Sequence, residues 1–188
     1  MADSRPALAR FDSTGALADS PGGAAAVARG IGRLMARNDI WTIAEMPLVG
    51  GRRADLMGID ARGKVIIVEI KVARADLLGD AKWTDYLDHC DRFYWGLSPD
   101  LDRQCLETEA FHPERCGVIV ADGYDAEILR PAPLLKLAPA RRRVEVERLA
   151  RCAMRRRQVD ADPHCSSWGA AWSVENVGDP RGGQGGER

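Results

Sequence analysis

The chain has 188 residues, of which 45% are hydrophobic and 29% charged, a composition typical of a globular domain. Its formal net charge is −1, which excludes an overall basic signature for nucleic acid and leaves only local patches. No apolar run approaches the roughly 20 residues that cross a bilayer, and the N-terminus lacks the apolar core of a signal peptide. Five cysteines without regular spacing argue against a disulfide framework. We therefore expect a cytoplasmic protein.

The chain divides into a central domain and two polar ends. Residues 1–21 are small and polar, with Pro and Gly interspersed, and we expect a disordered tail there. Residues 159–188 turn Gly-rich and lose periodicity, so a second disordered tail is expected. The segment between them, 22–158, is expected to form one folded domain.

The first half of the domain is predicted to hold one helix and three strands. Val27, Ile31 and Leu34 recur at helical spacing in an alanine-rich segment. Pro, Gly and Asp residues then separate runs rich in apolar residues, as is typical of strands and turns. The predicted elements are a helix at 22–37 and strands at 40–46, 53–60 and 64–71. The short turn at 61–63 makes the last two strands an antiparallel hairpin.

The second half continues with alternating helices and strands. Asp76 is a candidate N-cap for one helix, and Ser98 followed by Pro99 is a candidate start for another. The predicted elements are a helix at 76–90, a strand at 92–97, a brief helix from 98, strands at 117–121 and 125–129, and a helix at 140–158. This order predicts an α/β fold with a mixed central sheet flanked by helices.

Two charged residues interrupt the apolar strand at 64–71. Glu69 and Lys71 are two residues apart and therefore share one face of the strand. Burying charge without a partner is costly, so this pair has no packing reason to lie there. Asp55 of the preceding strand joins them if the hairpin register makes the two faces coincide. Such a group suits a Mg²⁺ ion, with the Ile70 carbonyl as a further oxygen, for phosphodiester hydrolysis by a metal-activated water.

The same residues also fit a purely structural explanation. The charged pair is then a surface cross-strand ion pair, and Asp55 is a solvated residue at the edge. Glu45, in the first predicted strand, is either a further acid of the site or a buried acid paired with Arg52 or Arg53. Spacing alone leaves both explanations open.

Charged and aromatic residues continue the pattern beyond this strand. After Glu69 and Lys71 comes the spacing D-x-x-x-D-x-K-W-x-x-Y, followed by C-D-x-F-Y. These positions are Asp76, Asp80, Lys82, Trp83, Tyr86, Cys90, Asp91, Phe93 and Tyr94. Asp55 followed by Glu69 and Lys71 resembles the PD-(D/E)XK nuclease core. The joint pattern more closely resembles the MmcB-like DNA repair proteins of bacteria, over about residues 22–157.

The resemblance implies a PD-(D/E)XK nuclease-like (restriction-endonuclease-like) sheet and a metal-dependent DNA nuclease in DNA repair. Asp55, Glu69 and Lys71 are then the active-site positions, and Asp55 and Glu69 hold Mg²⁺ or Mn²⁺. The superfamily often adds a glutamate from the first helix, which this chain lacks, so Glu45 would substitute. The alternative is a catalytically degenerate nuclease fold that binds DNA or acts as a scaffold.

DNA is the partner that the resemblance implies, and other repair proteins could join it. No membrane partner is expected, and the oligomeric state stays open. Asp80 and Lys82 are secondary site candidates because their helix follows the strand directly, although Lys82 also fits a solvated lysine. We expect Arg53, Arg74 and Lys82 to contact DNA. The arginine-rich last helix suits either a DNA-contacting surface or a solvated helix end.

Cysteine and histidine residues in the second half offer one more candidate. Their spacing matches no compact zinc motif, and cysteines are often simply buried. The residues concerned are Cys90, Cys105, His112 and Cys116. A zinc site is therefore the weaker explanation.

Overall fold

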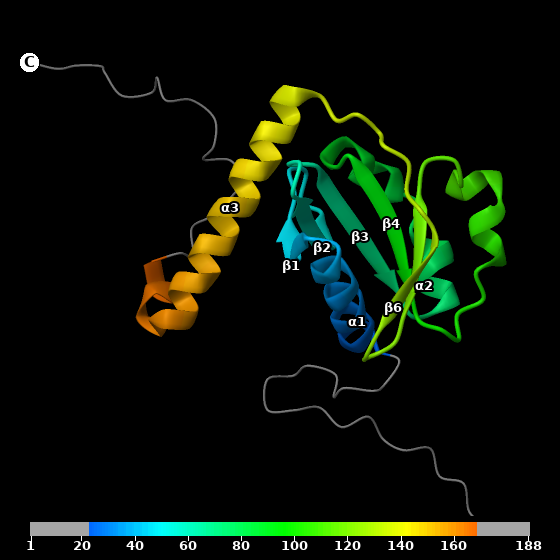
Figure 1. Ribbon diagram of the computed structural model, residues 1–188, viewed down its shortest axis with the longest axis horizontal. Helices are drawn as coiled ribbons and strands as arrows, with labels where there is room; N and C mark the ends of the chain where they lie inside the picture. The colour runs from blue at the N-terminus through cyan, green and yellow to red at the C-terminus, as the bar shows by residue number, and fades with distance from the viewer. Residues whose placement is uncertain (1–22, 169–188) are drawn as a thin grey trace, which may run out of the picture.

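The computed structural model describes residues 23–168, which form a six-stranded mixed sheet with helices on both faces (Figure 1). The strands are β1 (Ile40–Pro47), β2 (Arg53–Asp60), β3 (Val65–Lys71), β4 (Arg92–Leu97), β5 (Gly117–Ala121) and β6 (Ala126–Arg130). They lie in chain order across the sheet. The central pairs β3–β4 and β4–β5 are parallel and the others antiparallel. The predicted α/β fold with a mixed sheet is confirmed.

The two faces of the sheet carry different helices. Helix α1 (Ala24–Arg37) packs its apolar stripe, which includes Val27 and Ile31, on one face. On the other face lie α2 (Arg74–Gly79), the 3₁₀ helix η1 (Trp83–His89) and α3 (Pro139–Ala161). The further short 3₁₀ helices are η2 (Gln104–Glu107), η3 (Glu109–Phe111) and η4 (Pro163–Trp168). None of the helices in the described part of the chain is long and apolar enough to span a membrane.

Strand β3 lies at the centre of the fold, and all of its residues are buried. Ile66 and Val68 face the core under α1. Ile67 faces the other core, beneath η1 and α3. Because side chains alternate along a strand, Glu69 and Lys71 share the face of Ile67. The two charged residues therefore lie on the side of the sheet that α2, η1 and α3 cover.

The helix predicted at 76–90 is wrong as one continuous element. The chain instead forms α2, a break at Asp80, and then η1. Asp80 has a non-helical backbone (φ −83°, ψ 66°), and its carboxylate contacts Lys71 and Arg52. Asp76 does not cap the helix, because Ala73 is the N-cap and Asp76 lies in the first turn. Tertiary ion pairing outweighs helix propensity here, and Gly79 weakens the helix further.

The brief helix expected from Ser98 is also absent from the described structure. The Ser98 amide donates a hydrogen bond to the Lys71 carbonyl, which prolongs the pairing of β3 with β4. A turn closed by the Leu101 amide and the Ser98 carbonyl follows, and the first 3₁₀ helix begins only at Gln104. Ser98 therefore takes part in the strand pairing and does not start a helix.

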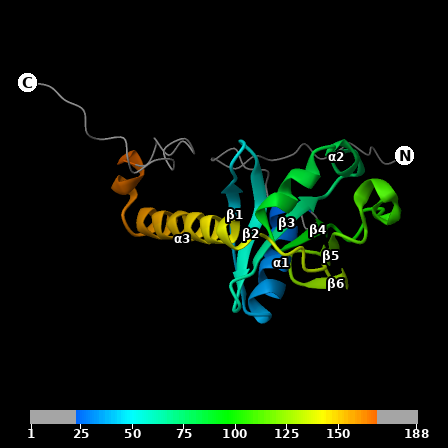
Figure 2. The ribbon, with the colours of Figure 1, turned by 90° about the horizontal axis from the view of Figure 1, so that it is seen from above.

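Helix α3 is longer than the predicted 140–158 and leaves the body of the domain. Its first half packs on the sheet, and its second half extends past the edge of β1, where the Arg156 side chain still contacts the β1 backbone (Figure 2). The helix continues to Ala161, and η4 follows it, within the segment expected to be a C-terminal tail. The expected tail at 1–21 and the end of the chain from 169 lie outside the described residues.

Candidate functional site

Three acidic residues lie at neighbouring register positions on β1, β2 and β3, at one end of the sheet. The β1–β2 register pairs Ala44 with Leu56 and Met46 with Ala54, which sets Glu45 opposite Asp55. The β2–β3 register, continued one step past its last pair, sets Asp55 opposite Glu69. The hairpin register that the sequence left open therefore places Asp55 beside Glu69 on one face.

Asp55 occupies the point where β2 and β3 stop pairing. Its Oδ2 accepts a hydrogen bond from the Ile70 amide at 2.7 Å, in place of a partner from β2. The N–H and C=O of one strand residue point to the same side, so the Ile70 carbonyl faces the same gap. Burial raises the pKa of Asp55, and the Ile70 hydrogen bond and the Lys71 charge offset only part of that rise.

Glu69 is buried and only half satisfied. The Glu69 and Lys71 residues are 6% and 5% exposed, and Lys71 Nζ lies 3.3 Å from Glu69 Oε1. Glu69 Oε2 is buried without a hydrogen-bond partner among the described residues. Burial and the neighbouring Asp55 charge raise the pKa of Glu69 to about 7, against the opposing effect of Lys71. A buried carboxylate oxygen with no partner is costly, and it is a ready ligand for a cation.

Lys71 is shared among several acids. Its ammonium lies 3.0 Å from Asp80 Oδ2 and 3.7 Å from Asp76 Oδ1, and 5.9 Å from the centre of the Trp95 ring. Burial lowers the pKa of Lys71, but Asp80 and Glu69 outweigh that effect and hold it above the ordinary value. Lys71 therefore stays charged beside Glu69, and Asp80 fixes its position.

Two further residues complete the surroundings of the site and were not assigned to it from the sequence. Arg52 lies 3.7 Å from Asp80 and 2.9 Å from Asp85, and its guanidinium lies over the Tyr86 ring. Trp95 is the β4 neighbour of Glu69 in the parallel pairing. Only the folded structure brings Trp95 next to Glu69, because the two residues are distant in sequence.

The other expected site residues lie on the surface. Glu45 has a left-handed backbone (φ 54°) and pairs with Arg53 at 2.5 Å, where the two side chains are 50% and 64% exposed. Arg74 is exposed and forms an ion pair with Asp102. Lys82 is exposed at the N-cap of η1. The structure thus gathers Asp55, Glu69, Lys71 and Asp80, and places Arg53, Arg74 and Lys82 outside this group.

The donor set limits which metal the site could hold. Within residues 23–168, no group of three or more His, Cys, Asp or Glu side chains is arranged to hold a metal ion. Mg²⁺ in such sites takes only one or two protein carboxylates and keeps several waters. Asp55, Glu69 with its unpaired Oε2, and the Ile70 carbonyl fit that requirement. The first helix supplies no acid to the site, as the sequence predicts: α1 carries none and lies on the other face of the sheet.

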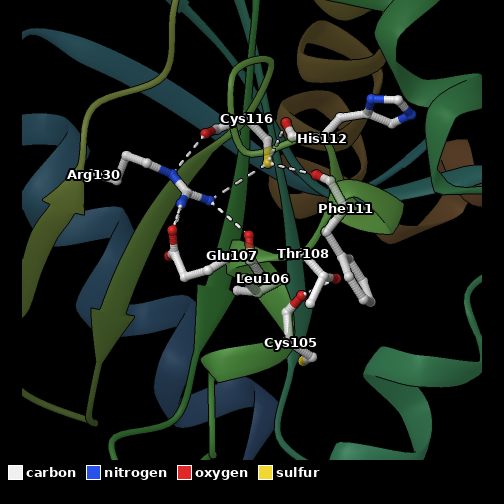
Figure 3. Close-up of polar contacts among 8 residues, drawn as sticks. All are labelled: Cys105, Leu106, Glu107, Thr108, Phe111, His112, Cys116 and Arg130. Atoms are coloured by element: carbon white, nitrogen blue, oxygen red, sulfur yellow. Dashed lines mark hydrogen bonds and ion pairs between the residues drawn. The ribbon is translucent and has the colours of Figure 1, made fainter.

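The cysteines with His112 do not gather into a zinc site among the described residues. Figure 3 shows the His112 ring turned away from the Cys116 thiol and from Cys105. The Cys116 thiol instead donates to the backbone carbonyls of Phe111 and His112, at 3.2 and 3.5 Å. Arg130, paired with Glu107, closes this cluster, which joins β6 to η2 (Figure 3).

Comparisons with known proteins agree with the motif in the sequence. A family model described as DNA repair protein MmcB-like matches residues 14–163. Among solved structures, protein SPO1766 of unknown function from Silicibacter pomeroyi is similar, with 38% identity and a TM-score of 0.69. The match covers 79% of this chain and 96% of that one. The search of curated proteins found no match. The chain therefore belongs to the MmcB-like family of DNA repair proteins.

Proposed function

We propose that this protein acts in DNA repair as a metal-dependent hydrolase of DNA phosphodiester bonds, with a site of the PD-(D/E)XK type. One observation carries the proposal. Asp55 and Glu69 lie at facing positions where β2 and β3 stop pairing, and within residues 23–168 Glu69 keeps a buried oxygen without a partner beside the charged Lys71. Family membership supports the repair context, and the activity is our inference from the site.

The proposed roles follow from the chemistry of each group. Asp55 and Glu69, with the Ile70 carbonyl, would hold Mg²⁺ or Mn²⁺ through hard oxygen atoms. Such an ion supplies polarisation of the phosphate and a bound water of lowered pKa. Lys71, adjacent to Glu69, would orient the attacking water and offset the negative charge that develops on the phosphate.

Asp80 acts on the reaction through Lys71. It lies 3.0 Å from the Lys71 ammonium and is itself held by Arg52. Because Asp80 fixes the long, flexible Lys71 side chain in advance, less conformational entropy is lost when the transition state forms. We therefore assign Asp80 a positioning role, and leave direct contact with the substrate to Lys71.

A second candidate function is a DNA-binding repair protein that has lost the catalytic activity of the fold. The observation in its favour concerns Glu45, which was expected to replace the acid that the first helix lacks. Glu45 is exposed and paired with Arg53, which leaves two carboxylates at the site. This candidate retains DNA binding without cleavage.

Cleavage of labelled DNA substrates in Mg²⁺ or Mn²⁺ tests the proposal. Glu69→Gln and Lys71→Met should each reduce the rate by about 100-fold or more, since the first removes a metal ligand and the second removes the cation beside the developing charge. Asp125→Asn, an exposed acid paired with Arg37, is the matched control and should cleave like the wild type. Equal rates for Glu69→Gln and wild type would remove the site from the mechanism. DNA binding without cleavage by the wild type would favour the second candidate.

A further inference from the structure

We propose that Arg53 binds a DNA phosphate at the entrance to the candidate site, and that Glu45 holds the Arg53 side chain there in the free protein as a stand-in for that phosphate. When DNA binds, Arg53 exchanges the carboxylate for the phosphate. The inference deepens the proposed function and rests on it for the identity of the ligand. It assigns a substrate contact to Arg53 and a positioning role to Glu45.

The backbone of Arg53 is fixed next to the candidate site. Arg53 is the first residue of β2 and precedes Asp55 by two positions. Its carbonyl accepts a hydrogen bond from the Tyr86 hydroxyl at 3.3 Å. The preceding residue, Arg52, lies 3.7 Å from Asp80. The base of the Arg53 side chain therefore has a defined position beside the site.

The Arg53 side chain is far more accessible than the cations deeper in the site. The side chains of Lys71 and Arg52 are 6% and 24% exposed, whereas that of Arg53 is 64% exposed. The Arg53 charge is also near enough to act against the rise in the pKa of Asp55 that burial causes. A phosphate that approaches Asp55 from solvent can therefore reach Arg53.

Glu45 has a strained backbone where it meets Arg53. Its φ of 54° lies in the left-handed region, which is costly for a residue with a side chain, although Glu45 lies within strand β1. Arg156 supports this conformation, because its guanidinium donates to the Ala44 carbonyl and, at 2.9 Å, to the Glu45 carbonyl. In this conformation the Glu45 carboxylate lies 2.5 Å from Arg53. Strain that the surrounding structure maintains in this way is concentrated at functional sites.

The pair of Arg53 and Glu45 is suited to exchange with a ligand. Both side chains are at least half exposed, and ion pairs in such positions contribute little to stability. The planar guanidinium of arginine matches a carboxylate and a phosphate in the same bidentate way. Contact with DNA also releases counterions from the DNA backbone, which favours the phosphate over the carboxylate. Glu45 therefore keeps Arg53 in place for a phosphate and gives way to it.

A purely structural role for the pair makes a different prediction. Glu45 lies opposite Asp55 in the β1–β2 register, and like charges directly opposite each other are destabilising. Arg53 would then only offset that repulsion, and the loss of either partner would leave DNA affinity unchanged. Exchange with a phosphate instead predicts opposite effects on DNA affinity for the two partners of one ion pair.

The test is binding of a labelled DNA duplex, measured by fluorescence anisotropy in a chelator across about 50–200 mM salt. Arg53→Gln should weaken binding about fivefold or more and reduce the slope of log K against log salt by about one. Glu45→Gln should tighten binding about two- to fivefold, because the competing carboxylate is removed. Arg53→Lys, which keeps the charge, should retain the slope.

The matched controls are Arg37→Gln and Asp125→Asn, which each remove one partner of a similarly exposed ion pair at α1. Both should bind DNA like the wild type. Glu45→Arg combined with Arg53→Glu keeps the net charge and reverses the pair, and it should bind as weakly as Arg53→Gln. Equal changes at the two ion pairs, a reversed pair that binds like the wild type, or a wild type without salt-dependent duplex binding would each overturn the inference.

The proposed hydrolytic function has a separate readout. Unchanged cleavage in Glu69→Gln would overturn that function, while opposite affinity changes confined to Arg53 and Glu45 would still support the exchange. Unchanged DNA affinity in both Arg53→Gln and Glu45→Gln, with the cleavage defect of Glu69→Gln intact, would overturn the exchange alone.

Discussion

Two buried acids of this fold, Asp91 and Glu69, differ in how fully the protein supplies partners for their carboxylate oxygens. Asp91 accepts hydrogen bonds from the Val65 amide at 3.0 Å and from two nitrogens of Arg142, at 2.8 and 2.5 Å. Burial alone would raise the pKa of Asp91, but these bonds outweigh it and hold that pKa below the ordinary value. Glu69 has one oxygen near Lys71 and one without a partner, and its pKa rises to about 7.

The difference separates a structural cluster from one that is prepared for a ligand. Asp91 joins β4, β3 and α3, and every contact that it needs is supplied by the chain. Glu69 is left with an unmet contact at a cost in stability, which proteins accept mainly at functional sites. Removing a partner of Asp91 should therefore cost stability, whereas neutralising Glu69 should not.

The largest effect is expected from Arg142→Met. It leaves Asp91, which is fully buried, without its main partner, and should lower the free energy of unfolding by about 3–5 kcal/mol in urea denaturation. Arg143→Met is the control. Arg143 is the next residue and pairs with Glu147 at the surface, where its side chain is 81% exposed, so its loss should leave the urea midpoint almost unchanged. Similar costs for both variants would contradict a structural role for the Asp91 cluster.

Glu69→Gln, measured with a chelator present, is expected to raise the free energy of unfolding, and by less than Arg142→Met lowers it. The folded-state pKa of about 7 exceeds the ordinary 4.5, so the folded protein holds this proton more tightly than the unfolded chain. The resulting stability is complete below 4.5 and is lost as the pH rises through 7. At about pH 8 the variant should be more stable than wild type by on the order of 2 kcal/mol, with little difference near pH 4.5.

The same urea titration decides that prediction. A Glu69→Gln protein that is less stable than wild type at about pH 8 would mean that the ion pair with Lys71 outweighs the burial of the acid. Glu69 would then belong with Asp91 among the structural residues, and the contrast between the two clusters would fail.

The smallest effect is expected from Glu45→Gln. Glu45 and Arg53 form an exposed ion pair, which should contribute below about 1 kcal/mol to unfolding measured in urea. Because its carboxylate is paired with Arg53, Glu45 is not expected to bind the metal ion. The cleavage rate of Glu45→Gln should therefore fall by less than about tenfold. A loss as large as that of Glu69→Gln would instead place Glu45 among the metal ligands.

Much of the sheet could be predicted because its information is local. Alternating or continuous apolar runs with Gly and Pro between them located β2, β3 and β4 closely. The break at Asp80 could not be predicted, because it depends on ion pairs with Lys71 and Arg52 that form only in the folded chain. Local propensity favoured one helix there.

The candidate site was predictable in its residues and not in its arrangement. The spacing of Glu69 and Lys71 in an apolar run was visible, but the register that sets Asp55 opposite Glu69 was not. The same limit applied to Asp91, whose partner Arg142 is 51 residues away in the chain. Pairing across such distances is a property of the packed fold.

Mn²⁺ titration of the metal-free protein measures whether Asp55 and Glu69 hold a divalent ion. We expect saturable binding to the wild type, loss of that binding in Asp55→Asn and in Glu69→Gln, and normal binding in the Asp125→Asn control. All four proteins should remain folded, because neither site substitution removes a partner on which the core depends. A wild type without saturable binding, or an Asp55→Asn variant that binds like wild type, would contradict the assignment of Asp55 and Glu69 as a metal site.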